Sequence, residues 1–182
     1  STFLIYDPHE MEAHRVGYSK VTIFIIVRFE RFWIQFADKV ITVSEPIKSW
    51  YCNTYRLDNV YVIRNLPEVF HKDQFNVNLK EYFKIDASHL LFVYQGVIDS
   101  DRGIGSLLSV FEQCSKDKHI VFIGYGAGVD KVTKSEKENC NIHFHPAVSS
   151  KRLMSYTRCA SVGIFFVEEN KGLSYKYSFP NK

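Results

Sequence analysis

The sequence predicts an α/β fold built on parallel strands, and two observations carry this prediction. Short runs of β-branched and aromatic residues alternate with longer segments whose apolar residues recur at helical spacing. The strands return at intervals of roughly 20 to 30 residues, which is typical of βαβ units with right-handed crossovers. The predicted strands are residues 3–6, 40–43 and 60–63 in a first half, and residues 90–94, 120–123, 142–145 and 162–167 in a second.

The interval between residues 18 and 39 fits a helix better than a strand. Residues 21–27 are rich in β-branched side chains and would also suit a strand. From Ile25 onward, however, an apolar stripe and a polar stripe separate at helical spacing. The apolar stripe is Ile25, Phe29, Phe32, Trp33 and Phe36, and the polar stripe is Arg28, Arg31, Gln35 and Lys39. We expect a core helix with a solvated edge; the alternative is a basic stripe that lies against anionic lipid head groups.

Two further helices are predicted in the second half. The apolar residues Ile104, Leu107, Leu108 and Phe111 form one helical stripe, and residues 149–160 form a second helix-length interval that opens on two serines. Residues 66–89 carry a proline and several charges without a clear period, apart from a short helix near residues 79–83. This segment is the predicted linker between two domains.

Composition excludes several classes of protein. The 182 residues include 23 Lys and Arg against 20 Asp and Glu, a net charge of +3, which does not indicate a nucleic-acid partner. The longest apolar run, residues 21–27, is far shorter than the roughly 20 residues that a membrane span needs, and the opening residues do not resemble a secretion signal. The cysteines form no Cys-x-x-Cys pair, so we expect reduced, mostly buried thiols in a cytoplasmic protein. They are Cys52, Cys114, Cys140 and Cys159.

Ligands of parallel sheets gather at the carboxyl ends of the strands, so the residues that follow each strand are the informative ones. The loop of residues 96–103 leads from a strand into a helix and carries Arg102, which predicts an anion site; the alternative is a solvated arginine paired with Asp99 or Asp101. After the next strand, Gly124 and Gly126 predict a tight turn at which the backbone approaches a ligand closely.

Other polar residues are weaker candidates. His9 follows a strand between acidic neighbours, although a structural turn is the alternative. His143 and His145 alternate on one strand without a nearby third metal ligand, and Glu168 and Glu169 are expected to point to opposite faces. Residues 172–182 predict a second phosphate cradle, where a loop with several hydroxyl groups enters a helix that bears Lys182.

The order of these motifs resembles glycosyltransferase family 4 over nearly the whole chain. The matching segments are residues 7–10, 37–44, 62–65, 94–103, 123–126, 141–144 and 178–182. The resemblance implies a GT-B fold of two Rossmann-like parallel-sheet domains. Residues 1–65 would be the latter part of the acceptor-side domain and residues 90–182 most of the donor-binding domain, so we expect a chain that is incomplete at both ends and inactive alone.

The resemblance also implies an activity. A family member of this bacterial polysaccharide-assembly type moves a hexosyl or N-acetylhexosaminyl group from a UDP- or GDP-sugar to a glycan or lipid-linked acceptor. It retains the anomeric configuration and needs no metal or cofactor. The expected location is the cytoplasm, with peripheral contact at the inner face of the membrane. Alternatives are a nucleotide-sugar epimerase of the same fold and a non-catalytic nucleotide-binding module.

Site residues follow from the resemblance position by position. His9 would reach the donor sugar and Arg102, with the loop of Gly96, would bind the diphosphate. Gly124 and Gly126 would lie at the donor, and the turn of Pro146 and Ala147 would meet the nucleotide base. Ser174, Ser178 and Asn181 would wrap the sugar and distal phosphate, and Lys182 would stabilise the leaving diphosphate. Val97 stands where the family often has arginine, and Tyr177 where it has a glutamate.

Overall fold

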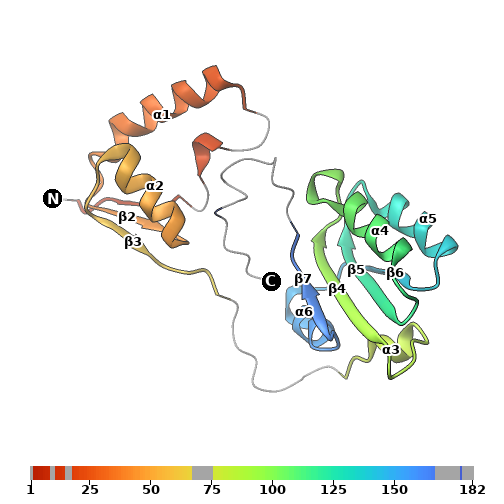
Figure 1. Ribbon diagram of the computed structural model, residues 1–182. Helices are drawn as coiled ribbons and strands as arrows, with labels where there is room; N and C mark the ends of the chain where they lie inside the picture. The colour runs from red at the N-terminus through yellow and green to blue at the C-terminus, as the bar shows by residue number, and fades with distance from the viewer. Residues whose placement is uncertain (1, 9–10, 15–17, 67–75, 167–176, 178–182) are drawn as a thin grey trace. The chain divides into compact units, whose positions relative to one another are not determined.

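The computed structural model describes residues 2–8, 11–14, 18–66, 76–166 and 177 (Figure 1). The chain divides into two compact units, Ser1–Glu68 with Glu169–Asn181, and Val69–Glu168 with Lys182. The division into an acceptor-side domain, a linker over residues 66–89 and a donor-binding domain stays a prediction.

The first unit is a parallel sheet with helices packed on one face. Its strands are β1 (Ile5–Tyr6), β2 (Lys39–Thr42) and β3 (Val60–Val62), in the order β1-β2-β3. Its helices are the short η1 (Glu12–His14), α1 (Lys20–Ile34) and α2 (Glu45–Tyr55). The core contains Val40 and Val60 from the sheet, Ile34 from α1, and Ile47 and Tyr51 from α2. The helices thus cover the sheet face that carries Val40 and Val60.

Both long helices of the first unit begin at a serine cap. The Ser19 hydroxyl accepts a hydrogen bond from the Thr22 amide at 3.1 Å, and the Ser44 hydroxyl accepts one from the Ile47 amide at 3.4 Å. Pro46 occupies the first turn of α2, where its missing N–H costs nothing, and Arg56 ends α2 in the left-handed conformation. The prediction missed α2, although these start signals are present in the sequence.

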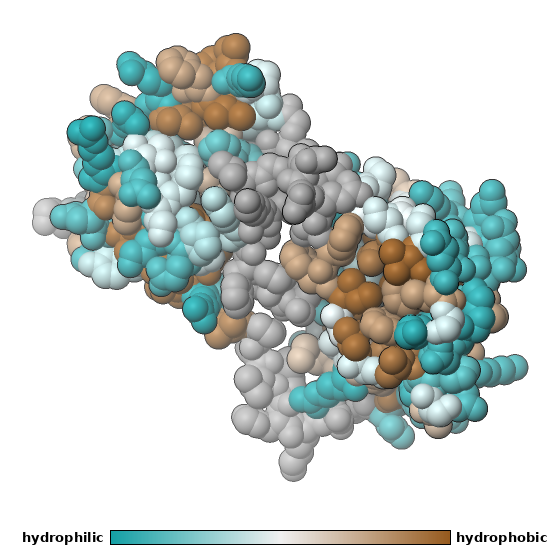
Figure 2. Space-filling model, in the orientation of Figure 1, coloured by the Kyte–Doolittle hydropathy of each residue, from teal (hydrophilic) through white to brown (hydrophobic). Residues whose placement is uncertain are grey.

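The apolar stripe of α1 is exposed, so the prediction of a core helix with a solvated edge is wrong for this face. Phe29 is 67% exposed, Phe36 61% and Trp33 56%. Figure 2 shows hydrophobic surface over α1. The helix instead packs through a neighbouring flank that buries Glu30 and Ile34.

The Glu30 carboxylate is the polar centre of the first unit. Its Oε1 accepts hydrogen bonds from the hydroxyls of Tyr6 and Tyr51, both at 2.7 Å, and its Oε2 accepts one from Tyr55 at 2.5 Å. Burial raises the pKa of the Tyr51 and Tyr55 hydroxyls, and the adjacent carboxylate raises it further. One buried charge thus ties β1, α1 and α2 together.

The second unit is a doubly covered parallel sheet in the order β6-β5-β4-β7. Its strands are β4 (Leu90–Val97), β5 (Lys118–Tyr125), β6 (Ile142–Pro146) and β7 (Val162–Ile164). Its helices are α3 (Leu79–Tyr82), η2 (Ser100–Arg102), α4 (Ile104–Gln113), α5 (Val129–Glu138) and α6 (Ser150–Thr157). Ile120 and Phe122 of β5 lie in one core with α4 and α5, whereas Val121 and Ile123 lie in another with α3 and α6. Both faces of this sheet are therefore buried, as parallel sheets require.

The described strands and helices confirm the predicted α/β class. Every predicted strand is present, although β7 ends at Ile164, and Val167 lies outside the described residues. The predicted helices at residues 104–111, 149–160 and 79–83 are α4, α6 and α3. The prediction missed α5, in which only Val132 and Ser135 are buried.

Three histidines form a ladder on the face of the second sheet that carries α3. His89 Nδ1 lies 3.0 Å from His119 Nε2, and His119 Nδ1 lies 3.0 Å from His143 Nε2. Burial lowers the pKa of His143 to about 4, and the neighbouring His119 lowers it too. Burial also lowers the pKa of His119, with a smaller effect from His89.

The four cysteines are free, and none is fully buried: Cys140 is exposed and the other three are half-buried. The expectation of mostly buried thiols is therefore wrong. Within the described residues, no helix is both long and apolar enough to cross a membrane.

Candidate functional site

The strand order of the second unit fixes where a ligand would bind. The chain runs from β4 outward through β5 to β6 and then returns through α6 to place β7 on the other side of β4. The order of strands therefore reverses between β4 and β7. In open parallel sheets, ligands bind outside the carboxyl ends of the strands at such a switch point.

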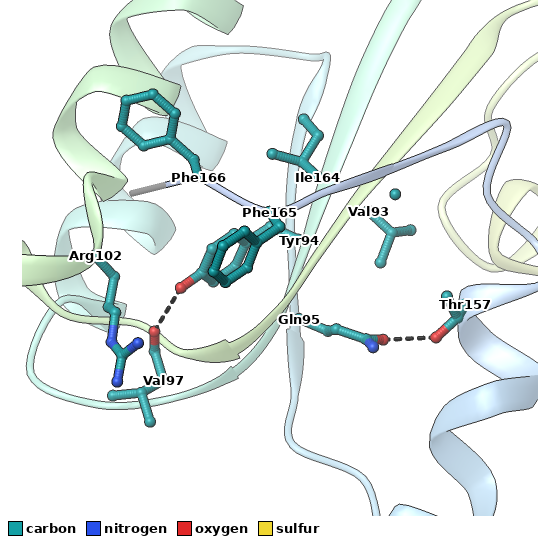
Figure 3. A pocket seen from close by; sticks show the side chains of 10 residues that line it. Val93, Tyr94, Gln95, Val97, Arg102, Thr157, Ile164, Phe165 and Phe166 are labelled. Atoms are coloured by element: carbon teal, nitrogen blue, oxygen red, sulfur yellow. Dashed lines mark hydrogen bonds between the residues drawn. The ribbon is translucent and has the colours of Figure 1, made fainter. Parts of the chain in front are cut away.

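A pocket lies at this switch point (Figure 3). Its walls come from β4, from β7 and the residues after it, from η2 and from α6. The lining residues are Val93, Tyr94, Gln95, Val97, Arg102, Thr157, Gly163, Ile164, Phe165 and Phe166. Most of this wall is apolar, with a few polar groups that converge on it, which is typical of small-molecule sites.

Two hydrogen bonds hold the polar part of the wall. The Thr157 hydroxyl donates to Gln95 Oε1 at 2.6 Å and ties the end of α6 to β4 (Figure 3). The Tyr94 hydroxyl donates to the Val97 carbonyl at 2.8 Å. Thr157 could not be identified from the sequence, because no local pattern places the end of a helix beside a strand more than sixty residues earlier.

Arg102 stands between the pocket and the start of α4. The Asp99 carboxylate accepts a hydrogen bond from the Ser100 amide at 2.7 Å and opens the single turn of η2. Gly103 then takes a φ of 67°, and α4 begins at Ile104. The half-buried Arg102 side chain lines the pocket beside Val97 (Figure 3). A guanidinium next to the positive end of a helix is suited to bind an anion.

Gly124 and Gly126 let the end of β5 and the residues after it pack closely against the end of β4 and Ile98. A Cβ on Gly124 would lie 1.8 Å from the Gly96 carbonyl oxygen, and one on Gly126 would lie 2.3 Å from the Ile98 carbonyl oxygen. The Ile98 amide donates to the Tyr125 carbonyl at 2.7 Å across the same contact. Close packing of the protein thus accounts for glycine at positions 124 and 126 without a ligand.

A second cation lies near the start of α4. A Cβ on Gly105 would lie 3.0 Å from Lys131 Nζ, so this ammonium from α5 sits beside the first turn of α4. The sequence reasoning missed Lys131, because its place beside α4 depends on how α5 packs. A cation at the positive end of a helix is favourable when an anion lies between them.

Not all the predicted site residues come together. Gly96 and Gly124 are paired near the carboxyl ends of β4 and β5, and Gly126 directly follows β5, so all three lie at the sheet edge from which the loop of Arg102 leaves. Pro146 and Ala147 are exposed at the carboxyl end of β6, two strands away from β4, and do not line the pocket.

The remaining candidates are placed as follows. His9, Glu168, Glu169, Ser174, Ser178, Asn181 and Lys182 lie outside the described residues. His143 belongs to the histidine ladder, and the His145 ring packs against Tyr156 with 4.9 Å between ring centroids. No group of three or more potential metal ligands occurs in the described part of the chain.

Comparison with known proteins shows the fold. No family model and no curated protein matches the chain. HepE of Anabaena, solved in complex with UDP, is 14% identical; the match has a TM-score of 0.65 and covers 91% of this chain and 47% of HepE. HepE solved with UDP-glucose matches with a TM-score of 0.64 at 13% identity, over 91% of this chain and 47% of that one. TarM matches with a TM-score of 0.60 at 14% identity, over 89% of this chain and 31% of TarM.

HepE and TarM are GT-B glycosyltransferases. The likeness, with the two parallel sheets, confirms the predicted fold class as α/β of the GT-B type. The chain spans less than half the length of these structures, covering 47% of HepE and 31% of TarM.

Proposed function

We propose that the chain is part of a glycosyltransferase that transfers a sugar from a UDP- or GDP-sugar to a glycan or lipid-linked acceptor, with retention of configuration. The observation that carries the proposal is the pocket at the switch point between β4 and β7, with Arg102 on its wall directly before α4. The likeness to HepE, which was solved with UDP and with UDP-glucose, supports a nucleotide sugar as the ligand of this pocket.

The groups around the diphosphate have the largest part in the proposed reaction, because they stabilise the leaving group. When the bond from the anomeric carbon to the diphosphate breaks, negative charge develops on the leaving diphosphate. Arg102 and the first amides of α4 stabilise this charge, and Lys131 adds a second cation beside the same helix turn. One such donor in a site from which water is excluded commonly contributes about 2.7–4 kcal/mol to the transition state.

Retention of configuration sets the roles of the other groups. The acceptor hydroxyl attacks from the face that the diphosphate leaves, and a diphosphate oxygen accepts its proton. In this proposal His9 orients the sugar or the acceptor hydroxyl and is not the nucleophile, while Lys182 and the loop residues Ser174, Ser178 and Asn181 hold the distal phosphate and the sugar.

Binding tests the site first. Calorimetric titration of the chain with UDP and with GDP should show binding of one of them, and Arg102→Ala should weaken that binding about 10-fold or more, because a hydrogen bond to a charged group contributes about 1.5–3 kcal/mol. The matched control is Lys134→Ala, which removes an exposed cation of α5 and should leave the affinity unchanged. Equal affinity of Arg102→Ala and the parent chain would contradict the proposal.

Turnover distinguishes a transferase, an epimerase and a non-catalytic module, which would all share such a site. The whole protein is incubated with the nucleotide sugar that binds and with candidate acceptors, and the products are separated. A new glycosidic product with the anomeric configuration of the donor supports the proposal. Inversion of a sugar carbon without transfer would indicate an epimerase, and binding without any product would indicate a non-catalytic module.

A further inference from the structure

The pocket at the switch point opens where the ladder between β4 and β7 ends. The last paired residues of these two strands are Tyr94 and Ile164, and the residues that follow them, Gln95 and Phe165, both line the pocket. The pocket has a volume of about 110 Å³. Sites that enclose a whole small ligand usually have roughly 300–1,000 Å³, so this pocket has room for only one part of a nucleotide sugar.

Gln95 is a polar side chain in a row that is otherwise apolar. Side chains two residues apart on a strand point to the same face, so Gln95 shares one face of the sheet with Leu91 and Val93. Leu91 and Val93 are buried in the core that α3 and α6 cover, whereas Gln95 is half-buried at the end of the row. Packing alone favours a third apolar residue at this position, so the glutamine needs another explanation.

Thr157 fixes the orientation of the Gln95 amide. The threonine hydroxyl donates to Gln95 Oε1 at 2.6 Å and has a longer contact of 3.0 Å with the Leu153 carbonyl. Figure 3 shows the side chain of Gln95 reaching across to Thr157. Because an amide group is planar, a hydrogen bond to Oε1 also sets the direction of Nε2. Gln95 therefore presents its NH₂ group to the pocket in one fixed orientation.

The NH₂ group of Gln95 still has hydrogens to donate. Among the described residues, none accepts a hydrogen bond from Gln95 Nε2. The two hydroxyls of the pocket wall already donate theirs, Thr157 to Gln95 and Tyr94 to the Val97 carbonyl. A donor that loses its water without gaining another partner is costly. A ligand that displaces water from this pocket must therefore offer an acceptor to Gln95.

Gln95 and Arg102 are suited to different parts of a ligand. Figure 3 shows Arg102 on the side of Val97 and Gln95 on the side of Thr157. A guanidinium forms its strongest hydrogen bonds with charged oxygens, such as those of a diphosphate. An uncharged amide is suited to an uncharged oxygen, such as a hydroxyl or a carbonyl.

These observations lead to one inference: we infer that Gln95 is a specificity-determining residue, whose Nε2 donates a hydrogen bond to an uncharged oxygen of the nucleotide sugar, on the sugar ring or on the nucleoside. Thr157 is its positioning residue, because it holds the amide in the orientation that binds. The inference rests on the proposed function, since it assigns one more contact to the ligand of the same pocket.

Calorimetric titration of the chain with UDP and with UDP-glucose tests the contact, and GDP and GDP-mannose replace them if the chain prefers guanine. Gln95→Met keeps the length of the side chain and removes the amide. It should weaken binding about 3- to 10-fold, the range for one neutral hydrogen bond. A loss for UDP-glucose alone supports a contact with the sugar, and an equal loss for both supports one with the nucleoside. The matched control is Gln113→Met at an exposed glutamine of α4, which should leave both affinities unchanged.

The positioning role of Thr157 has its own readout. Thr157→Val removes the hydroxyl and should weaken binding about 2- to 3-fold, because the amide must then be ordered by the ligand. Thr157→Ser keeps the hydroxyl and should bind as the parent chain does. In the Gln95→Met background, Thr157→Val should have no further effect, because its hydroxyl acts only through the amide. Thr133→Val is the control, since Thr133 of α5 also donates to a carbonyl of its own helix.

Failure of this inference differs from failure of the proposed function. A chain whose affinity falls in Arg102→Ala but not in Gln95→Met would overturn the inference alone, whether or not Gln95→Met lowers the unfolding midpoint. An equal loss of affinity in Gln95→Met for inorganic diphosphate, measured by displacement of UDP, would also overturn it, because the amide would then bind a charged oxygen. A chain that binds neither UDP nor GDP would contradict both.

Discussion

Glu30 and its three tyrosines show at the scale of single residues what holds the first unit together. The carboxylate accepts hydrogen bonds from Tyr6 of β1 and from Tyr51 and Tyr55 of α2. Hydrogen bonds to a buried charge are stronger than neutral ones, and the loss of one partner leaves the other group unsatisfied. The stability of the first unit should therefore depend on this one side chain.

We expect Glu30→Gln to destabilise the first unit by about 1–3 kcal/mol, because the amide nitrogen that replaces Oε2 cannot accept the Tyr55 hydrogen bond. Urea unfolding followed by tryptophan fluorescence measures the change. Tyr55→Phe removes the donor of the same bond, so the double variant should be less destabilised than the sum of the two single variants. Strict additivity would show that the bond contributes nothing, and Glu45→Gln at an exposed glutamate serves as the control.

Gly124 gives a second prediction at this scale. Gly124→Ala should destabilise the second unit by about 3 kcal/mol, because the added Cβ would lie 1.8 Å from the Gly96 carbonyl oxygen. Gly163→Ala is the matched control, since a Cβ there meets nothing within 4 Å on a strand of the same sheet. Urea unfolding followed by far-ultraviolet circular dichroism compares the two variants, and equal midpoints would contradict the packing argument.

The sequence could identify Arg102 as a site candidate but not its neighbours. A cation between a strand and a helix start is a local pattern, whereas Thr157 and Lys131 reach the same region only through the packing of α6 and α5. The glycines have a packing role that the sequence did not reveal, and their contact with a donor stays a prediction. Their spacing suggested room for a ligand, but Gly124 and Gly126 make room for another part of the protein.

At the scale of elements, the pattern of apolar residues predicted the strands better than the helices. In the second unit the short apolar runs are the strands, since a parallel strand buried on both faces is apolar throughout. α5 escaped prediction because a helix that buries only Val132 and Ser135 has no apolar stripe to detect. The stripe of α1 was detected, but a pattern shows only that a face is apolar and not what covers it.

The histidine ladder makes the stability of the second unit depend on pH. The folded chain holds the pKa of His143 at about 4, below the ordinary value of 6.5, so the unfolded chain takes up a proton at higher pH than the folded chain does. The stability from this group is therefore fully present above pH 6.5 and falls as the pH drops toward 4, by up to about 1.4 kcal/mol per pH unit.

Urea unfolding at a series of pH values between 7.5 and 4.5, followed by circular dichroism, measures this dependence. His143→Gln should flatten it, because the titrating group is gone. Phe144→Leu, at the next position of β6, should lower stability at every pH and keep the slope of the parent chain. A parent chain with equal stability at pH 7 and pH 5 would contradict the prediction.

At the scale of the whole molecule, the two units each have their own core, and we expect two unfolding transitions. Both tryptophans, Trp33 and Trp50, belong to the first unit, so their fluorescence reports that unit alone. UDP or GDP at 100 times its dissociation constant should stabilise the second unit by about 2.7 kcal/mol and raise its midpoint by about 10 °C.

The measurement compares circular dichroism, which reports both units, with tryptophan fluorescence as the temperature rises. The nucleotide should move the circular-dichroism transition of the second unit and leave the fluorescence transition in place. A nucleotide that moves the fluorescence transition would contradict the assignment of the pocket to the second unit alone. At the same nucleotide concentration Arg102→Ala should reduce the shift to about half or less, because a 10-fold weaker affinity leaves about 1.4 kcal/mol of stabilisation.

The fold class of the whole molecule was predictable from the sequence, because the order of motifs along the chain follows the order of strands and helices. The position of the pocket was not, because the strand order β6-β5-β4-β7 is a property of the folded sheet. Nothing in residues 162–164 shows that β7 pairs with β4 and not with β6. The reversal of strand order that creates the site is seen only in the folded sheet, where β7 lies beside β4.

The histidine ladder also restricts where its protons sit. Each N–N contact of 3.0 Å holds one hydrogen, so if His119 donates from Nδ1 to His143, its Nε2 must accept from His89. Both hydrogen bonds therefore point the same way along the ladder, and the neutral rings choose their tautomers together. If His89, at the end of the ladder, changed its tautomer, both hydrogen bonds would reverse. The proton of His143 would then move from one ring nitrogen to the other.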